Sequence, residues 1–427
     1  MDESLFQVFY STSGICTDTR SIGKDCLFVC IKGLNFDGNT FALKAIEAGS
    51  KHVIVDNPDY FEEGKAMTLV SDSIIYLQEL ANYHRKKFEI PIIGITGSNG
   101  KTTTKELINA VLSKKFNVLS TIGNLNNHIG VPLTLLRLNK QHEIAIIEMG
   151  ANKFKDIEEL CNIAEPTHGT ITNIGKAHLE GFQNFEGVLA TKCELYASVY
   201  QNNGVAFVNM DDDILTNALP DGIATFPYGS KNTSPVHGEL VALSPFVEMK
   251  LNGSEKVLKT QMIGKYNFYN YLTAAAFGVY FDVPFHQITE AIESYTPTNN
   301  RSQVKKTQSN TLILDCYNAN PSSMRSAIES FAMNEHPQKL MILGDMKELG
   351  KESKEEHERV IHQMEELRLK GFVVGQEFGA VDSLAISGTF ASVDDLVHHL
   401  SNNRLKNHLI LLKGSRSMKL EILESVL

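Results

Sequence analysis

The sequence has no run of apolar residues long enough to cross a membrane. No stretch of its 427 residues approaches the roughly 18 uninterrupted apolar residues that a transmembrane helix needs. The opening residues, MDESLFQVFYSTSG, also lack the basic region followed by an apolar region that marks a secretory signal peptide. We therefore expect a cytoplasmic protein without membrane insertion.

Cysteines are few and scattered along the chain. They stand at positions 16, 26, 30, 161, 193 and 316, and no two of them form a CxxC pair. This spacing predicts neither a disulfide framework nor a zinc site. We interpret the cysteines as small buried hydrophobic residues.

Basic residues are not in excess. The chain has 40 Lys and Arg against 50 Asp and Glu, which gives a formal net charge of -10. A nucleic-acid groove needs a basic face, so we expect no nucleic-acid partner. With 42% hydrophobic and 21% charged residues, the composition is that of an ordinary globular protein. Its length exceeds what one hydrophobic core normally organises and predicts two or three domains.

The pattern of apolar runs predicts an α/β protein with three domains. Residues 1–88 alternate short strand-like runs with helix-like stretches, which indicates a small N-terminal α/β domain. Residues 89–297 contain apolar strands typical of a mostly parallel sheet, and Asn252-Gly253 predicts a β-hairpin there. Residues 298–427 repeat a strand followed by a helix, ending with a helix over MKLEILESVL. This repeat is typical of a Rossmann-like, doubly wound domain.

The stretch GITGSNGKTTTKE, residues 94–106, predicts a P-loop that binds phosphate. It follows an apolar strand and precedes a helix, so Gly97 and Gly100 let backbone N–H groups approach phosphate oxygens. Lys101 would reach the β and γ phosphates, and Thr102 would offer a hydroxyl to Mg²⁺. The strict motif needs glycine where Ile95 stands, so the loop is a shortened variant. The alternative, a Gly/Asn turn with an accidental Lys-Thr, does not explain the flanking strand and helix.

Two residues at the ends of apolar runs are candidate metal ligands. Glu148 ends the run AIIE, and His178 follows the run ITNIG. A buried charge is costly unless it is paired or binds a metal. A carboxylate and an imidazole facing one phosphate loop would suit one or two Mg²⁺ ions. A salt-bridged or helix-capping carboxylate and a hydrogen-bonded core histidine are the alternatives.

Lys192 and Glu194 interrupt an otherwise apolar helical stretch, VLATKCELY. A buried lysine has a lowered pKa and can become a reactive amine. The pattern alone favours the other interpretation, a solvated helix face.

A series of motifs resembles the Mur ligases of peptidoglycan synthesis in order and approximate spacing. These motifs are GITGSNGKTTTKE, TIGNLNNHIGVPLTLL, IEMGA, TNIGKAHLEGF, GKYNFYNYLTA, NNRSQ, DCYNANPSSM, LGDMKELGKES and LLKGSRSM. The shortened loop is shared with folylpolyglutamate ligases and indicates only the superfamily. GNLNNHIGVP, DCYNANPSSM and LGDMKELG are more similar to the Mur ligases that join D-alanyl-D-alanine to UDP-N-acetylmuramoyl-tripeptide.

The resemblance implies an ATP-dependent, ADP-forming ligase. ATP would phosphorylate the terminal carboxylate of UDP-MurNAc-tripeptide, and the amine of D-Ala-D-Ala would attack the acyl phosphate to form the amide. The implied cofactors are ATP, two Mg²⁺ ions and a carbamylated lysine at Lys192, which reverses the interpretation from the pattern. We expect a monomer. A ligase for a single amino acid or for folate, and a nucleotide-driven switch protein, are the alternatives.

The resemblance also implies a role for each residue of the nucleotide site. ATP would contact the loop through Gly97, Ser98, Asn99, Gly100, Lys101, Thr102 and Thr103. Thr102 and Glu148 would bind the first Mg²⁺, and His178 with carbamylated Lys192 the second. Asn270, the second asparagine of an HNxxN motif that reads Tyr266-Asn267 here, would contact adenine. Arg301 would reach the phosphates and Asp315 the ribose, so the expected catalytic set is Lys101, Glu148, His178, Lys192 and Arg301.

Substrate contacts are implied in all three predicted domains. The first domain would bind the UDP end through Thr17, Asp18, Arg20 and Asn35 and through the segment that continues to Gly38; polar turns are the alternative. Asn126 and Asn127 match the loop for the muramoyl peptide, with His128 where glutamate is common. Around the acceptor, the residues implied are Asn318, Asn320, Lys413 and Arg416. A solvated charge cluster is the alternative for the last two.

Overall fold

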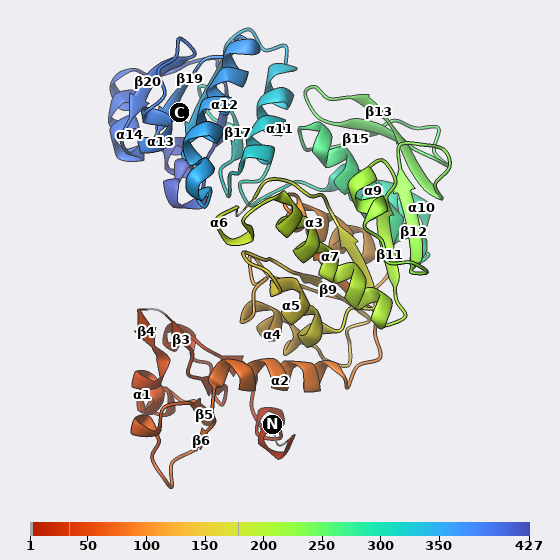
Figure 1. The fold of residues 1–427 in the computed structure, drawn as a ribbon, viewed down its shortest axis with the longest axis vertical. Coiled ribbons are helices and arrows are strands. Elements are labelled where there is room, and N and C mark those ends of the chain that lie inside the picture. Colours follow the sequence, from red (N-terminus) through yellow and green to blue (C-terminus); the bar gives the residue numbers. More distant parts are fainter. Residues whose placement is uncertain (1–2, 34, 178) are drawn as a thin grey trace.

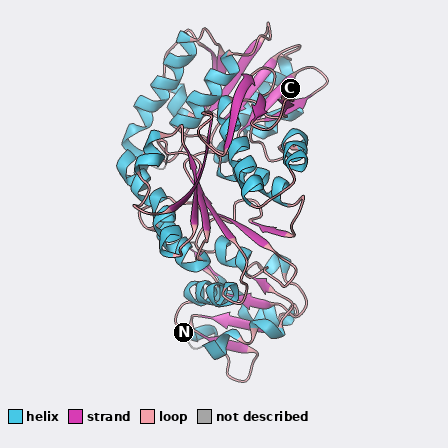
Figure 2. Cartoon of the chain, turned by 90° about the vertical axis from the view of Figure 1, so that its right-hand side faces the viewer, coloured by secondary structure: helices cyan, strands magenta, loops and turns pink. Residues whose placement is uncertain are grey.

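The computed structural model describes residues 3–33, 35–177 and 179–427. Its three larger sheets follow one another along the chain, over residues 15–69, 92–259 and 303–413. The first lies at one end of an elongated molecule, and the other two lie beyond it (Figure 1). Helices pack around all three sheets (Figure 2). The α/β class and the three-part architecture are as predicted, while the boundaries at 88 and 297 remain predictions.

The N-terminal sheet is small and entirely parallel. Its order is β1 (Ile15–Cys16), β2 (Leu27–Val29), β5 (His52–Val55) and β6 (Met67–Leu69). Helix α1 (Ala42–Glu47) packs on β5, and a separate hairpin pairs β3 (Lys32–Gly33) with β4 (Phe36–Asp37). One face of this sheet therefore has a core of its own, which includes Phe28, Val53 and Val55.

Helix α2 (Ser73–Arg85) joins the N-terminal part to the central part. Asp72 caps it by accepting hydrogen bonds from the N–H groups of Ile74 and Ile75. The helix packs on α4 (Gly130–Leu135) and α5 (Asp156–Ala164) of the central part. Its buried Tyr76 and Leu80 belong to the same hydrophobic cluster as central-sheet residues. The two parts thus share one continuous core.

The central sheet has the order β15 (Leu258–Lys259), β14 (Glu248–Leu251), β13 (Val236–Ala242), β12 (Ala224–Gly229), β11 (Val205–Asn209), β10 (His168–Ile171), β7 (Ile92–Thr96), β9 (Ile144–Glu148) and β8 (Val118–Ser120). In this sheet, the predicted phosphate loop follows β7, the third strand from the β8 edge. The seven strands β7 to β13 are all parallel, and β14 and β15 each pair antiparallel with the strand before them. Because β7 and β9 are buried on both faces, they read as continuous apolar runs.

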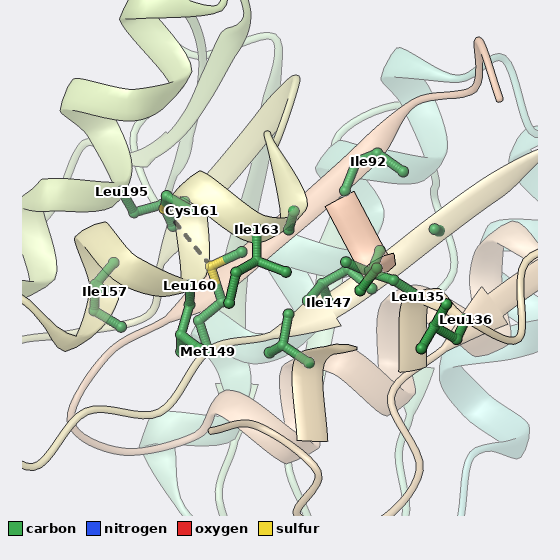
Figure 3. Close-up of a cluster of buried hydrophobic side chains, with 14 of the residues drawn as sticks. Ile92, Leu135, Leu136, Ile147, Met149, Ile157, Leu160, Cys161, Ile163 and Leu195 are labelled. Carbon is green, nitrogen blue, oxygen red and sulfur yellow. Dashed lines mark hydrogen bonds between the residues drawn. The ribbon is translucent and has the colours of Figure 1, made fainter. Parts of the chain in front are cut away.

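Helices cover both faces of the central sheet. Helices α3 (Lys101–Leu112), α9 (Lys265–Tyr280) and α10 (Phe285–Ser294) form one cluster with Ile93 and Ile95 of β7. On the opposite face, α5 and α7 (Phe185–Gln201) pack around Ile92 and Ile147. Figure 3 shows this second cluster, in which the Cys161 thiol lies 3.8 Å from the Met149 sulfur. All six cysteines are free and five are buried, as interpreted from the sequence.

The hairpin expected at Asn252-Gly253 forms with a longer connection. Strands β14 and β15 pair antiparallel, with Met249 opposite Leu258, and residues 252–257 connect them. The Asn252 side chain instead bonds to the neighbouring strand region, accepting from the His237 N–H and donating to the Pro235 carbonyl. That tie to β13 removes Asn252 from a two-residue turn.

The C-terminal sheet is doubly wound, as predicted. Its order is β16 (Gln303–Lys306), β17 (Thr311–Asp315), β21 (Leu409–Lys413), β18 (Lys339–Gly344), β19 (Gly371–Val374) and β20 (Ile386–Phe390). Only β16 runs antiparallel to its neighbour. Helices α11 (Pro321–Ala332), α12 (Ser353–Glu366) and α13 (Gln376–Gly379) cover one face, and α14 (Val393–Asn402) covers the other.

The helix expected over MKLEILESVL is wrong in type. The segment forms 3₁₀ turns at Arg416–Met418 and Leu420–Ser425, separated by Lys419 in the left-handed region at φ 53°. Buried Leu420 and Leu423 pack against the C-terminal sheet. Side chains three residues apart share one side of a 3₁₀ turn, so this short element satisfies both contacts. Across the described part of the chain, no helix is long and apolar enough to span a membrane.

Candidate functional site

A cavity of about 1500 Å³ lies where the central and C-terminal sheets face each other. Parallel strands direct their carboxyl ends to one edge of a sheet, where ligands usually bind. Glu148 and Asn209 end β9 and β11 of the central sheet, and Asp315 and Lys413 end β17 and β21 of the C-terminal sheet. All four line the cavity. The carboxyl-terminal edges of both sheets thus line the same cavity.

The phosphate loop joins β7 to α3 and depends on two glycines. Gly97 has φ 139°, and a Cβ there would lie 2.0 Å from the Thr172 hydroxyl. Gly100 has φ 81°, and a Cβ there would meet the Asn270 side chain at 3.0 Å. Both the backbone angles and the close neighbours therefore require glycine. The predicted shortened loop has the strand-loop-helix setting that was expected.

The start of α3 faces the cavity. Gly100, Lys101, Thr102 and Thr103 all line it. The first N–H groups of a helix have no partner within the helix and attract anions. Before them, the N–H groups of Ser98 and Asn99 donate to the backbone and side-chain oxygens of Asn173, at 2.9 and 3.1 Å. Asn173, which the sequence did not single out, thus fixes the loop and leaves the helix start for an anion.

Lys101 folds back over the loop. Its Nζ donates to the carbonyls of Gly97 and Ser98, at 2.7 and 3.3 Å. Burial lowers the pKa of Lys101 to about 8; nearby Glu148 opposes that shift and Arg301 adds to it. An anion at the helix start would favour the charged form of this amine.

Glu148 is buried, with 1% of its surface exposed. Its Oε1 accepts hydrogen bonds from the Thr102 hydroxyl at 3.1 Å and the Asn126 amide at 2.8 Å. Its Oε2 has no hydrogen-bond partner. An unpartnered buried carboxylate oxygen beside a threonine hydroxyl and a phosphate-binding loop is the hard donor set that Mg²⁺ prefers. The residues present therefore fit a Mg²⁺ ion.

Lys105 lies behind Glu148 and was missed in the sequence. Its side chain is fully buried, with Nζ 2.6 Å from the Thr121 carbonyl, 2.9 Å from Glu106 Oε1 and 3.9 Å from Glu148 Oε2. Thr121 in turn accepts the Glu148 N–H through its hydroxyl, at 3.0 Å. The available signal was its place one helical turn after Lys101, since residues four apart lie on one face of a helix.

Lys192 is buried in α7 with 2% of its surface exposed, so the solvated face expected from the pattern is wrong. The cause is that α7 packs against α5 and β10. Its Nζ lies 5.5 Å from the centre of the Phe182 ring. Burial, together with the charge of Lys101, holds the pKa of Lys192 well below its ordinary value. Glu194 is only half-buried and accepts the backbone N–H groups of Lys155 and Glu158.

No group of three or more His, Cys, Asp or Glu side chains able to hold a metal occurs among the residues that the structure describes. His178, the expected ligand of a second Mg²⁺, lies outside the described residues. A Mg²⁺ ion usually takes only one or two carboxylates and completes its shell with phosphate and water oxygens. Thr102 and Glu148 would suffice as protein ligands for one such ion.

Asn270 is held against the start of α3. Its Oδ1 accepts from the Thr104 hydroxyl at 3.1 Å, and its Nδ2 donates to Asn267 at 2.8 Å. Asn267 is itself fixed by donating to the Ile263 carbonyl at 2.7 Å. Tyr266, which replaces the histidine of the family motif, instead bonds to the Ser302 hydroxyl at 2.7 Å. Asn270 and Tyr266 line the cavity.

Arg301 stacks on Tyr317, another residue not foreseen, with its guanidinium carbon 3.9 Å from the ring centre. Its Nε is buried without a hydrogen-bond partner. Asp315 accepts from the Ser302 N–H at 3.2 Å and from the Lys413 Nζ at 2.6 Å. Arg301, Asp315, Tyr317 and Lys413 all line the cavity. The linker arginine is thus preorganised, with unused donor capacity.

The predicted substrate residues divide between the cavity and other places. Asn126, Asn127, Asn318 and Asn320 line it, and the Asn127 side chain also accepts the N–H groups of Ile129 and Gly130. Arg416 does not line the cavity and pairs with Glu421 at 3.0 Å.

The residues expected at the UDP end lie in the N-terminal part, away from the cavity. Asp18 and Arg20 pair with each other at 2.6 Å, and this pairing lowers the pKa of Asp18 to about 2. Thr17 and Asn35 each lie outside the helices and strands, and none of the four residues lines the cavity. Their contacts with a nucleotide sugar remain predictions.

Family models place the chain among ligases. The models described as "Mur ligase family, catalytic domain", "Mur ligase middle domain" and "Mur ligase, glutamate ligase domain" match residues 11–97, 95–278 and 300–416. The chain belongs to the Mur ligase family.

Relatives similar over nearly the whole chain include ligases that use D-alanyl-D-alanine, by their names. The chain is 33% identical to a UDP-N-acetylmuramoyl-tripeptide--D-alanyl-D-alanine ligase of Bacillus subtilis, over 96% of this chain and 91% of that one. It is 31% identical to the enzyme of that name from Escherichia coli, over 95% and 92% of the two chains. The crystal structure of MurF from Acinetobacter baumannii superposes with a TM-score of 0.87 at 29% identity, covering 98% and 97%. That of Thermotoga maritima MurF in complex with ADP gives 0.85 at 26%, covering 97% of each chain.

Proposed function

We propose that this chain is an ATP-dependent ligase that joins D-alanyl-D-alanine to UDP-N-acetylmuramoyl-tripeptide in peptidoglycan precursor synthesis. The observation that carries the proposal is the shared cavity. The start of α3, which we propose binds phosphate, lines this cavity together with Arg301, Asp315 and Lys413 of the linker and the C-terminal sheet. Full-length similarity to enzymes of that name, and to a MurF structure that holds ADP, supports the choice of substrates.

In the first chemical step, a carboxylate oxygen of the tripeptide attacks the γ-phosphorus of ATP. ADP leaves, and an acyl phosphate forms. Both reactants are anionic, so cations must offset their repulsion. Lys101 lies at the loop, and Arg301 lines the same cavity. We assign the phosphates to these two residues and to the first turn of α3.

Thr102 and Glu148 would hold Mg²⁺, which would supply positive charge to offset that of the phosphates. Lys192 is a buried amine with a lowered pKa. A lowered pKa increases the neutral fraction of a lysine, and only a neutral amine adds CO₂ to form a carbamate. We therefore keep carbamylated Lys192 and His178 as the proposed ligands of a second Mg²⁺.

In the second step, the amine of D-Ala-D-Ala attacks the acyl carbon, and phosphate leaves as the amide forms. Asn318, Asn320 and Lys413 lie on the C-terminal side of the cavity and are proposed to orient the acceptor. We retain 1–88, 89–297 and 298–427 as domains for the UDP end, ATP and acceptor. The substrates are small and water-soluble, so we propose a cytoplasmic monomer.

A panel of donors and acceptors tests this function. Purified protein is incubated with ATP and Mg²⁺, and amide products and ADP are measured by mass spectrometry. We expect an amide only with UDP-MurNAc-tripeptide and D-Ala-D-Ala. Turnover with a single amino acid and none with the dipeptide would reassign the chain to another ligase of the family. Phosphate release without any amide, unaffected by the sugar peptide, would indicate a nucleotide-driven switch.

A further inference from the structure

Lys176 of the central part bonds to the C-terminal part. It lies on the loop that follows β10, and its Nζ donates to Glu356 Oε1 at 2.9 Å and to Glu352 Oε2 at 3.3 Å. Its backbone N–H donates to the Ser322 hydroxyl at 3.0 Å. Glu352 and Glu356 belong to η6 (Gly350–Glu352) and α12, and Ser322 belongs to α11. One residue therefore bonds to both α11 and α12.

The loop that carries Lys176 is tied to the phosphate loop. Gly175 bonds to the Ser98 hydroxyl through both its carbonyl, at 3.0 Å, and its N–H, at 2.9 Å. Gly175 also approaches the C-terminal part closely, since a Cβ there would lie 2.7 Å from the Ser322 hydroxyl. Lys176 therefore bonds to α11, and the preceding residue, Gly175, bonds to the phosphate loop. A movement of α11 can thus be transmitted to the phosphate loop through these two residues.

The contact is built so that it can open. Glu356 has 3% of its side chain exposed, and a buried carboxylate left without a cation is strongly destabilising. Arg359 of the same helix also donates to Glu356 Oε1, at 2.6 Å. If Lys176 withdraws, Glu356 keeps this partner, while Lys176, at 39% exposure, returns to water. The ion pair can therefore break and re-form without stranding a buried charge.

We propose that Lys176 is a positioning residue that holds the C-terminal part against the phosphate loop for ligation. The inference rests on the proposed function, because closure brings Arg301 to the bound phosphates and keeps Asp315 and Lys413 at the cavity for the ribose and the acceptor. Without the contact, a smaller fraction of molecules is closed at any moment. Apparent affinities then fall by that fraction, whereas saturating substrates restore closure. Loss of Lys176 should raise KM more than it lowers kcat.

The test compares Lys176→Ala, Lys176→Arg and Glu356→Gln in the full-length protein. For Lys176→Ala and Glu356→Gln we expect KM for the acceptor dipeptide to rise about threefold to tenfold, with kcat within about twofold. The double variant should be no worse than the poorer single variant, and Lys176→Arg should restore most of the loss. Lys256→Ala removes a 2.8 Å ion pair to Glu293 inside the central part and serves as the matched control.

A structural readout separates this inference from the proposed function. Small-angle scattering with and without ADP and Mg²⁺ measures compaction whatever the acceptor is. We expect the ADP-bound Lys176→Ala protein to stay more extended than wild type, and Gly175→Ala, which adds a Cβ against Ser322, to do the same. Wild-type KM values and wild-type scattering in Lys176→Ala would overturn the inference even if D-Ala-D-Ala is ligated. If wild-type protein makes no amide but becomes more compact with ADP and Mg²⁺, and Lys176→Ala does not, only the substrate assignment would be refuted.

Discussion

The Asn320 amide of the C-terminal part donates a 2.7 Å hydrogen bond to the Asn99 side chain of the phosphate loop. The same Asn320 caps α11, because its Oδ1 accepts the Ser323 N–H at 2.8 Å. One side chain therefore starts a helix with its oxygen and contacts the nucleotide site with its nitrogen. The two roles can be separated by a change that keeps the oxygen and removes the nitrogen.

Asn320→Asp makes this separation. Aspartate caps helices as well as asparagine does, so we expect the stability of the C-terminal part to be unchanged. A carboxylate beside the loop would lose the bond to Asn99 and repel phosphate, so ADP affinity should fall by about tenfold or more in calorimetric titrations. Ser392→Asp adds the same charge at the cap of distant α14 and should bind ADP normally. Equal affinity in both variants would contradict the proposed nucleotide site.

Removing the cation behind Glu148 should destabilise the protein. Lys105→Met leaves the buried Glu148 carboxylate without its lysine, and we expect a loss of about 3 kcal/mol in urea unfolding. Adding Glu148→Gln to that variant removes the unpaired charge and should recover part of the loss, so the two effects will not add. Lys114→Ala breaks the exposed 3.0 Å pair with Glu290 and should cost less than about 1 kcal/mol. Strict additivity would show that the two groups are not coupled.

Lys192→Ala should lose most ligase activity if the lysine acts as a carbamate. Added short carboxylates such as acetate should partly restore the rate, because they can occupy the vacant anionic position. The same additives should not rescue Lys101→Ala, whose missing group is a cation. Full activity of Lys192→Ala without additive would exclude a role for the carbamate.

His168 should make stability depend on pH. Its ring lies among Tyr280 and Phe281, with centroids 5.3 and 5.2 Å away, and burial lowers its pKa from 6.5 to about 4. Between pH 6.5 and 4, His168 is therefore protonated more readily in the unfolded chain than in the folded chain. The contribution of His168 to the free energy of unfolding is fully present above pH 6.5. It is lost as the pH falls toward 4, and the loss reaches up to about 3 kcal/mol.

His168→Phe fits this aromatic cluster and cannot be protonated. Thermal unfolding of both proteins between pH 4.5 and 8 should show a difference that is constant above pH 7. Below pH 6.5 the difference should shift in favour of the variant. Curves that stay parallel down to pH 4.5 would show that His168 carries no such linkage.

The strand-end pattern predicted Glu148, because positions that end apolar parallel strands converge at one edge of a sheet. Asp315 and Lys413 were expected from the family resemblance alone, and in the structure they also end parallel strands. The contacts that were missed come from partners far apart in sequence. Lys105 is explained only by Glu148 and Thr121, and Tyr317 only by Arg301. A periodic pattern also could not show that α7 is enclosed on both sides, which is why it misplaced Lys192.

The shared core around α2 divides the molecule mechanically into two bodies rather than three. Tyr76 and Leu80 belong to the same hydrophobic cluster as Ile147 and Met149, whereas the buried members of the C-terminal clusters all lie beyond residue 311. The N-terminal and central parts should therefore melt as one cooperative unit, and in hydrogen exchange α2 should open together with the central sheet. Hinge motion is left to the connection near residue 300, so a compound wedged beside Arg301 could arrest the enzyme without touching either of its peptide substrates.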